Sequence, residues 1–198
     1  YTPFKKFFPK IGENSLSGNV VREVHQDEDG NLWIGTEDAG LNKLDTGTGV
    51  FTHFKPDRSG RSISYTNIHG LLVNGDELWV GTFEHGLDVP NIKTGKLLRH
   101  YSVGEGRNSL KSNFIYCISK IDDTDIMIGT TRGAYLFNQK QNDFSLLPGM
   151  PLNIWYTTLL KDDKDIIWAG TYGNGIIYYD TRTRLSRNLR YDAVNKNS

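Results

Sequence analysis

The sequence contains little cysteine, no excess of charge of either sign and no long apolar run, and each absence excludes a class of protein. Its 198 residues include one cysteine, Cys117, so an intramolecular disulfide and a cysteine-rich zinc site are both excluded. Lys plus Arg equals Asp plus Glu at 23 each, so the basic surface expected of a nucleic-acid-binding domain is missing. No segment approaches the roughly 20 apolar residues of a membrane-spanning helix. No segment keeps a helical apolar period over several turns either, so we expect essentially no helix.

The sequence does contain a tetrapeptide that occurs four times, at intervals of 46, 48 and 41 residues. The four copies are Trp33-Ile34-Gly35-Thr36, Trp79-Val80-Gly81-Thr82, Met127-Ile128-Gly129-Thr130 and Trp168-Ala169-Gly170-Thr171. Each copy lies on the second of four short strand-like segments, which are separated by polar turns rich in Asp, Asn and Gly. A period in the forties that is made of short strands is typical of the blades of a β-propeller.

The pattern predicts an all-β fold with four complete four-stranded antiparallel blades and one additional outer strand. We expect the blades at about residues 16–55, 63–102, 110–147 and 152–191, within a single partial β-propeller domain over 1–198. Residues 1–10 match the fourth strand of a blade, because Phe4 and Phe7 repeat the interval between Phe51 and Phe54. The tail, residues 191–198, resembles the start of a linker into another repeat. The chain is therefore expected to be a fragment of a larger propeller.

The tetrapeptide has a physical logic in such a fold. A large aromatic side chain on a middle strand fills the gap between neighbouring sheets. The Gly two positions later allows a side chain of the next sheet to approach closely. Met127 replaces Trp in the third copy, where its flexible side chain fills the same gap.

A longer pattern surrounds the tetrapeptide. In the first repeat its residues are Asn19, Val20, Asp27, Gly30, Leu32-Trp33-Ile34-Gly35-Thr36, Gly40-Leu41, Asp45, Thr48-Gly49 and Phe51. This pattern resembles the two-component regulator propeller repeat, and the resemblance covers nearly the whole chain. The sequence departs from the family pattern at Met127, at Ala134, where Leu is usual, and in repeats three and four, which lack the Thr-Gly turn. These departures are ordinary drift between repeats.

The resemblance implies a function for the parent protein. Family members look like hybrid two-component sensors of Bacteroides relatives, in which propellers and a small β-sandwich precede a membrane helix, a histidine kinase and, in many members, a response regulator. By resemblance, this chain is a non-catalytic periplasmic sensor region, and its parent protein is dimeric and anchored in the inner membrane. The implied ligand is an oligosaccharide or another small molecule, and the implied partners are further blades and the β-sandwich. No cofactor and no nucleic acid are expected to bind to the chain.

The sequence gives weaker evidence for other classes of function. The chain has no Gly-x-Ser-x-Gly elbow, and its five histidines show no zinc-binding spacing, so we expect neither catalytic nor metal-binding residues. The carboxylates of Glu37, Asp38 and Glu84 are the best enzymatic signal, because paired carboxylates serve glycosidases. The alternatives are therefore a protein-interaction propeller and, behind it, a propeller lyase or glycosidase.

Comparison of the four repeats predicts where a ligand binds. The segments between the second and third strands differ from repeat to repeat, as does a position on the first strand that we assign to Arg22, Gly70, Tyr116 and Tyr156. These segments are expected at one end of the propeller axis, where aromatic faces, amides and acids suit a carbohydrate. The candidate ligand-binding residues are Glu37, Asp38, His69, Glu84, His85, Tyr116, Arg132, Trp155, Tyr156, Tyr172 and Asn174.

Overall fold

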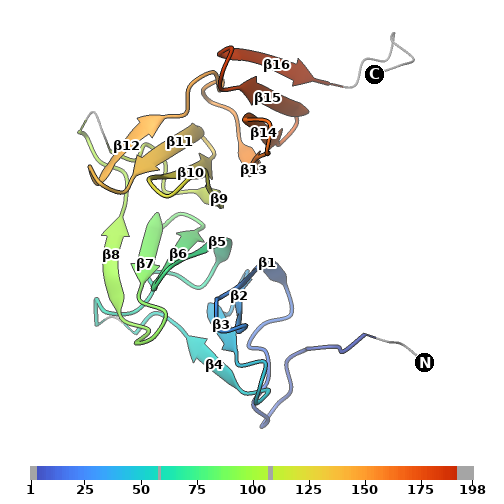
Figure 1. Ribbon diagram of the computed structural model, residues 1–198. Coiled ribbons are helices and arrows are strands. Elements are labelled where there is room, and N and C mark those ends of the chain that lie inside the picture. Colours follow the sequence, from blue (N-terminus) through green and yellow to red (C-terminus); the bar gives the residue numbers. More distant parts are fainter. Residues whose placement is uncertain (1–3, 58, 107–108, 191–198) are drawn as a thin grey trace. The chain divides into compact units, whose positions relative to one another are not determined.

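The computed structural model describes residues 4–57, 59–106 and 109–190, and these residues form strands but no helix. Sixteen strands make four separate four-stranded antiparallel sheets, each built from consecutive strands in sequence order (Figure 1). The all-β fold with four four-stranded blades is therefore confirmed. None of the described residues belongs to a helix that is long and apolar enough to cross a membrane.

Each blade is a meander that runs from an inner strand to an outer strand. The first blade contains β1 (Val21–Gln26), β2 (Leu32–Thr36), β3 (Leu41–Leu44) and β4 (Phe51–Phe54). The second contains β5 (Ile68–Asn74), β6 (Glu77–Thr82), β7 (Leu87–Pro90) and β8 (Leu97–Tyr101). The third contains β9 (Ile115–Lys120), β10 (Asp125–Thr130), β11 (Gly133–Asn138) and β12 (Asp143–Leu146). The fourth contains β13 (Tyr156–Lys161), β14 (Ile166–Thr171), β15 (Ile176–Asp180) and β16 (Leu185–Leu189).

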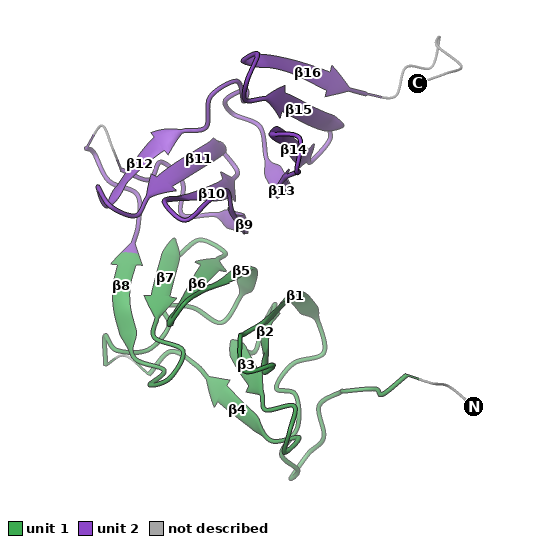
Figure 2. Ribbon diagram, viewed as in Figure 1, with its two compact units in different colours: residues 1–100 green, residues 101–198 purple. Residues whose placement is uncertain are grey.

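The chain divides into two compact units, Tyr1–His100 and Tyr101–Ser198 (Figure 2). The first unit holds the first blade and most of the second, and the second unit holds the third and fourth blades. The expectation of one partial domain over 1–198 stays a prediction.

The N-terminal segment differs from the expected outer strand. Residues 4–10 form no strand, although the ring of Phe7 contacts Phe51 edge-on at 5.9 Å between ring centroids. An outer strand needs the third strand of its own blade as a hydrogen-bonding partner, and residues 4–10 have none here. Residues 1–3 of this segment and the tail 191–198 lie outside the described residues.

The tetrapeptides wedge neighbouring blades together within each unit. In the first unit, Trp33 is 1% exposed and shares a core cluster with Ile68 and Val80 of the second blade. In the second unit, Met127 is fully buried in a cluster with Leu159 and Ile167 of the fourth blade. The predicted role of the bulky residue is therefore confirmed, and Met127 occupies the same gap as a Trp without exposure to solvent.

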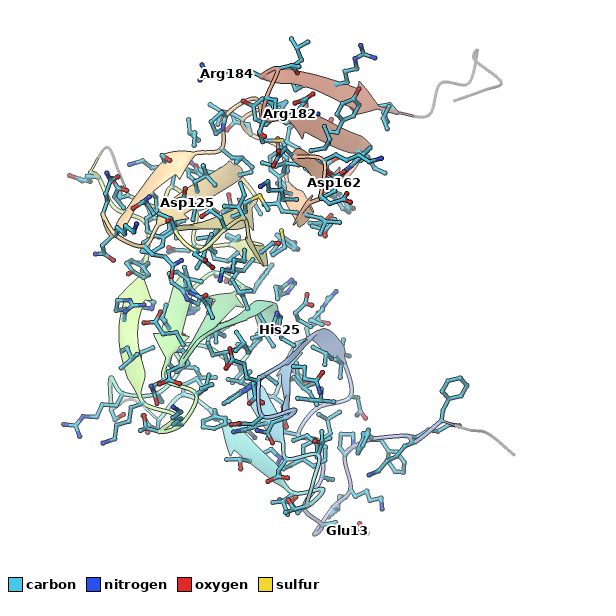
Figure 3. The ribbon with its side chains drawn as sticks, in the orientation of Figure 1. Glu13, His25, Asp125, Asp162, Arg182 and Arg184 are labelled. Atoms are coloured by element: carbon cyan, nitrogen blue, oxygen red, sulfur yellow. The ribbon has the colours of Figure 1, made fainter. Side chains whose placement is uncertain are left out.

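Two of the polar hairpins hold an indole in place. Asp27 Oδ2 accepts a hydrogen bond from Trp33 Nε1 at 3.0 Å, and Asp27 Oδ1 accepts one from the backbone N–H of Asn31 at 2.8 Å. Asp162, labelled in Figure 3, repeats the arrangement and accepts from Trp168 Nε1 at 2.8 Å. The carboxylate therefore closes the turn between the first two strands and fixes the wedge residue, which is a structural role.

Substitution of this carboxylate gives a pH-dependent prediction. Burial alone would raise the pKa of Asp27, but hydrogen bonds from Asn31 and Trp33 and the charge of Lys43 outweigh it and hold the pKa below its ordinary value. The charged form therefore stabilises the fold above the ordinary Asp pKa, and this stabilisation is lost as the pH falls through the depressed value. Asp27→Asn is expected to lower the free energy of unfolding by about 1–3 kcal/mol at neutral pH, because an NH2 group replaces one of the two acceptor oxygens and cannot accept a hydrogen bond from an N–H group.

Urea unfolding at neutral and acidic pH checks this expectation. The difference between the native chain and Asp27→Asn should shrink in acid, where the native carboxylate is itself protonated. Asp29→Asn, an exposed position on the same hairpin, is the matched control and should change stability little at either pH. Equal effects of the two substitutions would contradict the role assigned to Asp27.

Candidate functional site

The inner strand of every blade carries a bulge at the same place. The register between the first two strands shifts between Val21 and Glu23, between Ile68 and Gly70, opposite Gly129 and Thr130, and between Tyr156 and Thr158. In each inner strand the register between the first two strands skips one residue: Arg22, His69, Tyr116 and Thr157. A bulge changes the direction in which a side chain points. The residue at the bulge is therefore a variable position, distinct from the regularly paired residues of the same strand.

The bulge corrects the alignment of the repeats. The expected variable column contained Gly70 and Tyr156, whereas the structure places His69 and Thr157 there. Tyr156 has no exposed surface, lies in the core of the second unit and donates a hydrogen bond from its hydroxyl to the Pro151 carbonyl at 2.8 Å. Its burial raises its pKa to about 12. The prediction that Tyr156 binds a ligand is therefore wrong: it is a packing residue.

The second strand of each blade ends beside this bulge, because its terminal Thr closes the following turn. The Thr hydroxyl donates to the carbonyl of the Gly at the start of the third strand or directly before it, at 2.6–2.8 Å, in all four blades. The residue after the Thr then donates its N–H to the residue before the inner strand, as Glu37 does to Val20, Phe83 to Asn67 and Tyr172 to Trp155. Variable side chains from two segments are thus held next to one another by constant backbone bonds.

In the first unit these segments bring together charged and aromatic groups. Arg22 Nη2 forms an ion pair with Glu37 Oε2 at 2.8 Å, and both side chains are partly exposed. The ring of His69 stacks on Phe83 at 5.4 Å between centroids, with 25° between the planes. Burial lowers the pKa of His69, the charge of Arg22 lowers it further, and Glu37 opposes both. His69 is therefore neutral at neutral pH and can accept or donate one hydrogen bond.

The remaining candidates of the first unit lie on the same turns. The ring of His85 stacks on Tyr65 at 4.1 Å, with 21° between the planes. Glu84 is exposed and has a φ of 74°, so its backbone is in the left-handed region. Asp38 is exposed on the preceding blade. Glu37, one of the three carboxylates that gave the enzymatic signal, forms the ion pair with Arg22 described above.

In the second unit, three aromatic side chains form a continuous stack, which we call the aromatic ladder: Tyr116, Trp155 and Tyr172. The ring centroids of Tyr116 and Trp155 are 6.0 Å apart at 28°, and those of Trp155 and Tyr172 are 5.4 Å apart at 32°. Trp155 is 43% exposed and Tyr172 is 71% exposed, so a large part of the stack is open to solvent. The backbone N–H of Tyr172 donates a hydrogen bond to the Trp155 carbonyl at 2.9 Å, and this bond holds the two residues beside one another.

Asn174 lies on the same turn as Tyr172, and Arg132 lies on the turn between β10 and β11. Asn174 donates from Nδ2 to the Tyr172 carbonyl at 3.4 Å. Arg132 is exposed, and its carbonyl accepts from the backbone N–H of Asn153 at 3.2 Å. Arg132 also lines a pocket of about 290 Å³ together with Lys111, Tyr135 and Leu152. The second unit therefore combines stacking surface with hydrogen-bond donors, while the expectation that all candidates share one axial end stays a prediction.

The arrangement in each unit suits binding better than metal chemistry. Within the part of the chain that the structure describes, no three His, Cys, Asp or Glu side chains are placed to hold a metal ion. Stacked, partly exposed aromatic rings flanked by amide and guanidinium donors can hold a flat, hydroxyl-rich ligand through contact with the rings and hydrogen bonds at the edge.

Comparison with known proteins places this geometry in a family. Residues 15–38, which run from the first linker through the first tetrapeptide, match the family model described as two component regulator propeller. The chain contains a two-component regulator propeller repeat. The resemblance inferred from the residues is thereby confirmed, and the bulge, the Thr-closed turn and the wedge residue are the structural features of this repeat in the present chain.

Relatives of known name contain similar segments. The chain is 35% identical over 175 residues to Histidine kinase P4 of Formosa agariphila, an alignment that covers 83% of this chain and 13% of that protein. Two extracellular domains of hybrid two component systems from B. thetaiotaomicron are similar in structure, with TM-scores of 0.78 and 0.74 and sequence identities of 22% and 18%. Each of these alignments covers 93% of this chain and 26% of the solved chain. At these identities the solved structures establish the propeller fold, and the chain spans only a small part of each relative.

Proposed function

We propose that this propeller region is the ligand-sensing part of a hybrid two-component histidine kinase, and that it binds an oligosaccharide on the aromatic ladder. The region has no catalytic role in this proposal. The observation that carries it is the partly exposed stack of Tyr116, Trp155 and Tyr172, in which a backbone hydrogen bond joins the last two residues. Variation in these side chains changes the ligand without a change in the fold.

The physical chemistry of the ladder favours a sugar over other ligands. The ring planes differ by 28° and 32°, so the three rings do not lie in one plane. Sugar rings offer an apolar face to such a stack, while Asn174 and Arg132 supply donors on adjacent turns. The net charge of zero gives no long-range attraction for a highly charged ligand.

The similarity to Histidine kinase P4 supports the signalling half of the proposal. In this scheme the region lies in the periplasm, and its parent protein is dimeric and anchored in the inner membrane. Further blades and a β-sandwich of the same protein are its partners. A ligand that binds one arrangement of the dimer more tightly shifts the population toward it, and this shift biases the kinase across the membrane.

Isothermal titration of the purified protein with a library of oligosaccharides tests the proposal. At least one glycan is expected to bind, and Trp155→Ala should weaken it by roughly tenfold or more, because loss of a central Trp contact costs about 2 kcal/mol. Tyr172→Ala should weaken the same glycan by a smaller factor, since Tyr172 is the most exposed rung.

The matched control is Trp168→Phe, an aromatic substitution in the same blade at a position outside the ladder. This variant should bind the glycan with unchanged affinity. The proposal would be refuted if no oligosaccharide of the library bound to the full-length protein. It would also be refuted if Trp155→Ala and Trp168→Phe lowered the affinity for the glycan equally.

A further inference from the structure

A second candidate site lies in the first unit, away from the turns that carry the variable residues. A pocket of about 390 Å³ is lined by the linker between the first two blades and by the outer strand β8. Its walls include Pro56, Ile63, Leu97 and His100. The volume is within the roughly 300–1,000 Å³ range of small-molecule sites, and three of these four side chains are apolar.

The polar end of the pocket is a carboxylate–imidazole pair. Asp88 on β7 is fully buried, and its Oδ1 accepts a hydrogen bond from His100 Nδ1 at 2.7 Å. The backbone N–H and the hydroxyl of Ser64 both donate to Asp88 Oδ2, at 2.6 and 2.8 Å. A carboxylate can only accept, so the proton of neutral His100 is fixed on Nδ1. The imidazole side chain is 38% exposed, which leaves Nε2 available to the pocket.

Among the described residues, this carboxylate–imidazole pair occurs in the second blade and not at the equivalent positions of the other three. The position of Asp88, opposite the second residue of the tetrapeptide, is taken by Asn42, Tyr135 and Ile177 in the other blades. Asn42 accepts from the Ser17 backbone N–H at 3.0 Å, as Asp88 does from Ser64. Its neighbour His53, however, turns to the Ser15 carbonyl at 2.7 Å. A neutral amide thus holds the linker of the first blade, whereas the second blade buries a carboxylate that holds both the linker and His100.

We propose that the pocket binds a small organic carboxylate with an apolar body. The ligand carboxylate accepts a hydrogen bond from Nε2 of protonated His100, and its hydrocarbon part contacts Pro56, Ile63 and Leu97. Asp88 acts as a positioning residue, because it orients the ring and keeps the second proton on it. The site is independent of the aromatic ladder and of the function proposed for it.

Charge supports this choice of ligand. The hydrogen bond and the charge of Asp88 raise the pKa of His100, while partial burial lowers it by a smaller amount. On the elements packed against His100, β7 carries Asp88, and the described linker residues carry Lys55, Asp57 and Arg61. Hydrogen bonds from Ser59 and Ser62 lower the pKa of Asp57 to about 2, so its charge is constant near neutral pH. His100 is therefore the group whose proton controls binding in this pH range.

Titration of the purified protein with acetate, butyrate and hexanoate, followed by NMR, tests the inference. Affinity should rise with chain length, and resonances of Ile63, Leu97 and His100 should move together. Affinity for hexanoate should fall as the pH rises through the His100 pKa, because Nε2 loses the proton that it donates. Hexanamide, the neutral analogue, should bind roughly tenfold more weakly, since a charge-assisted hydrogen bond is about twice as strong as a neutral one.

Variants separate binding from a purely structural role. His100→Gln should weaken hexanoate binding by roughly tenfold, whereas His53→Gln, the equivalent position of the first blade, should leave it unchanged. Asp88→Asn copies Asn42, so the fold should persist while the pH at which binding is lost moves down. If no carboxylate binds, or if His100→Gln and His53→Gln bind hexanoate equally, the pair is only a structural clasp and the inference is overturned.

Discussion

Trp33→Ala is expected to lower the free energy of unfolding of the first unit by about 3–5 kcal/mol, the usual cost of removing a fully buried Trp. The indole is 1% exposed and packs against Ile68 and Val80 of the neighbouring blade, so its removal leaves a cavity between two sheets. The substitution also removes the hydrogen bond that the indole N–H donates to Asp27 at 3.0 Å. The substitution therefore removes both the packing of Trp33 against the second blade and its hydrogen bond to Asp27.

Urea unfolding, monitored by circular dichroism, measures this effect. Trp168→Ala is the matched control, because Trp168 occupies the same position of the tetrapeptide but is only half-buried. Its indole makes the same bond to an Asp and stacks on Tyr178 of its own blade, with 5.3 Å between ring centroids. A smaller loss is expected for Trp168→Ala. Losses of equal size would show that the contact between blades contributes little.

Gly129→Ala is expected to destabilise the second unit by about 1–3 kcal/mol or more, the range for overpacked cores. A Cβ at this position would meet Cys117 Sγ on β9 and, at 2.9 Å, the backbone carbonyl of Tyr156 on the next blade. The backbone contact cannot be relieved by a rotamer change, so the two blades would have to separate. The same substitution tests why the tetrapeptide requires Gly.

Gly47→Ala provides the control for this substitution. The nearest atom to a Cβ at that position is Asp45 Oδ1 at 3.4 Å, so the methyl group fits. Stability should stay unchanged or rise slightly, because Ala restricts the unfolded chain. A thermal melt of both variants decides the matter: a transition for Gly129→Ala that coincides with that of Gly47→Ala would contradict the close packing.

The fold followed from the sequence because its signals repeat. One tetrapeptide is a weak clue, but four copies with turn residues at matching offsets leave few architectures that bury both faces of short sheets. Trp33 and Met127 are buried between blades as their size suggested. Residues 4–10 failed as a strand because apolar spacing does not supply a hydrogen-bonding partner.

The site was harder to predict because one extra residue shifts every alignment. The bulge at His69 and at Thr157 moved the variable position by one residue, so Tyr156 was assigned to the surface although it is core. A column of large, mostly apolar residues could have revealed this error. The residues directly before the bulge are Val21, Ile68, Ile115 and Tyr156.

Interactions between side chains were beyond the sequence pattern altogether. Asp27 lies in a polar hairpin, yet it is buried and accepts a hydrogen bond from the Trp33 indole. Neither the pairing of Asp88 with His100 nor the stacking of Trp155 on Tyr172 could be foreseen, because each joins two segments whose offset the turns decide. Specific contacts of this kind depend on register, which the repeat pattern leaves undetermined.

The most direct test of the account is an indole N–H spectrum of the four Trp residues with and without a bound oligosaccharide. The indole N–H groups of Trp33 and Trp79, which are 1% and 0% exposed, should exchange slowly with solvent if they are packed in the core. If the aromatic ladder binds the ligand, the oligosaccharide should shift the indole signal of Trp155 alone. Rapid exchange at the two buried indoles, together with a Trp155 signal that no glycan moves, would contradict the account.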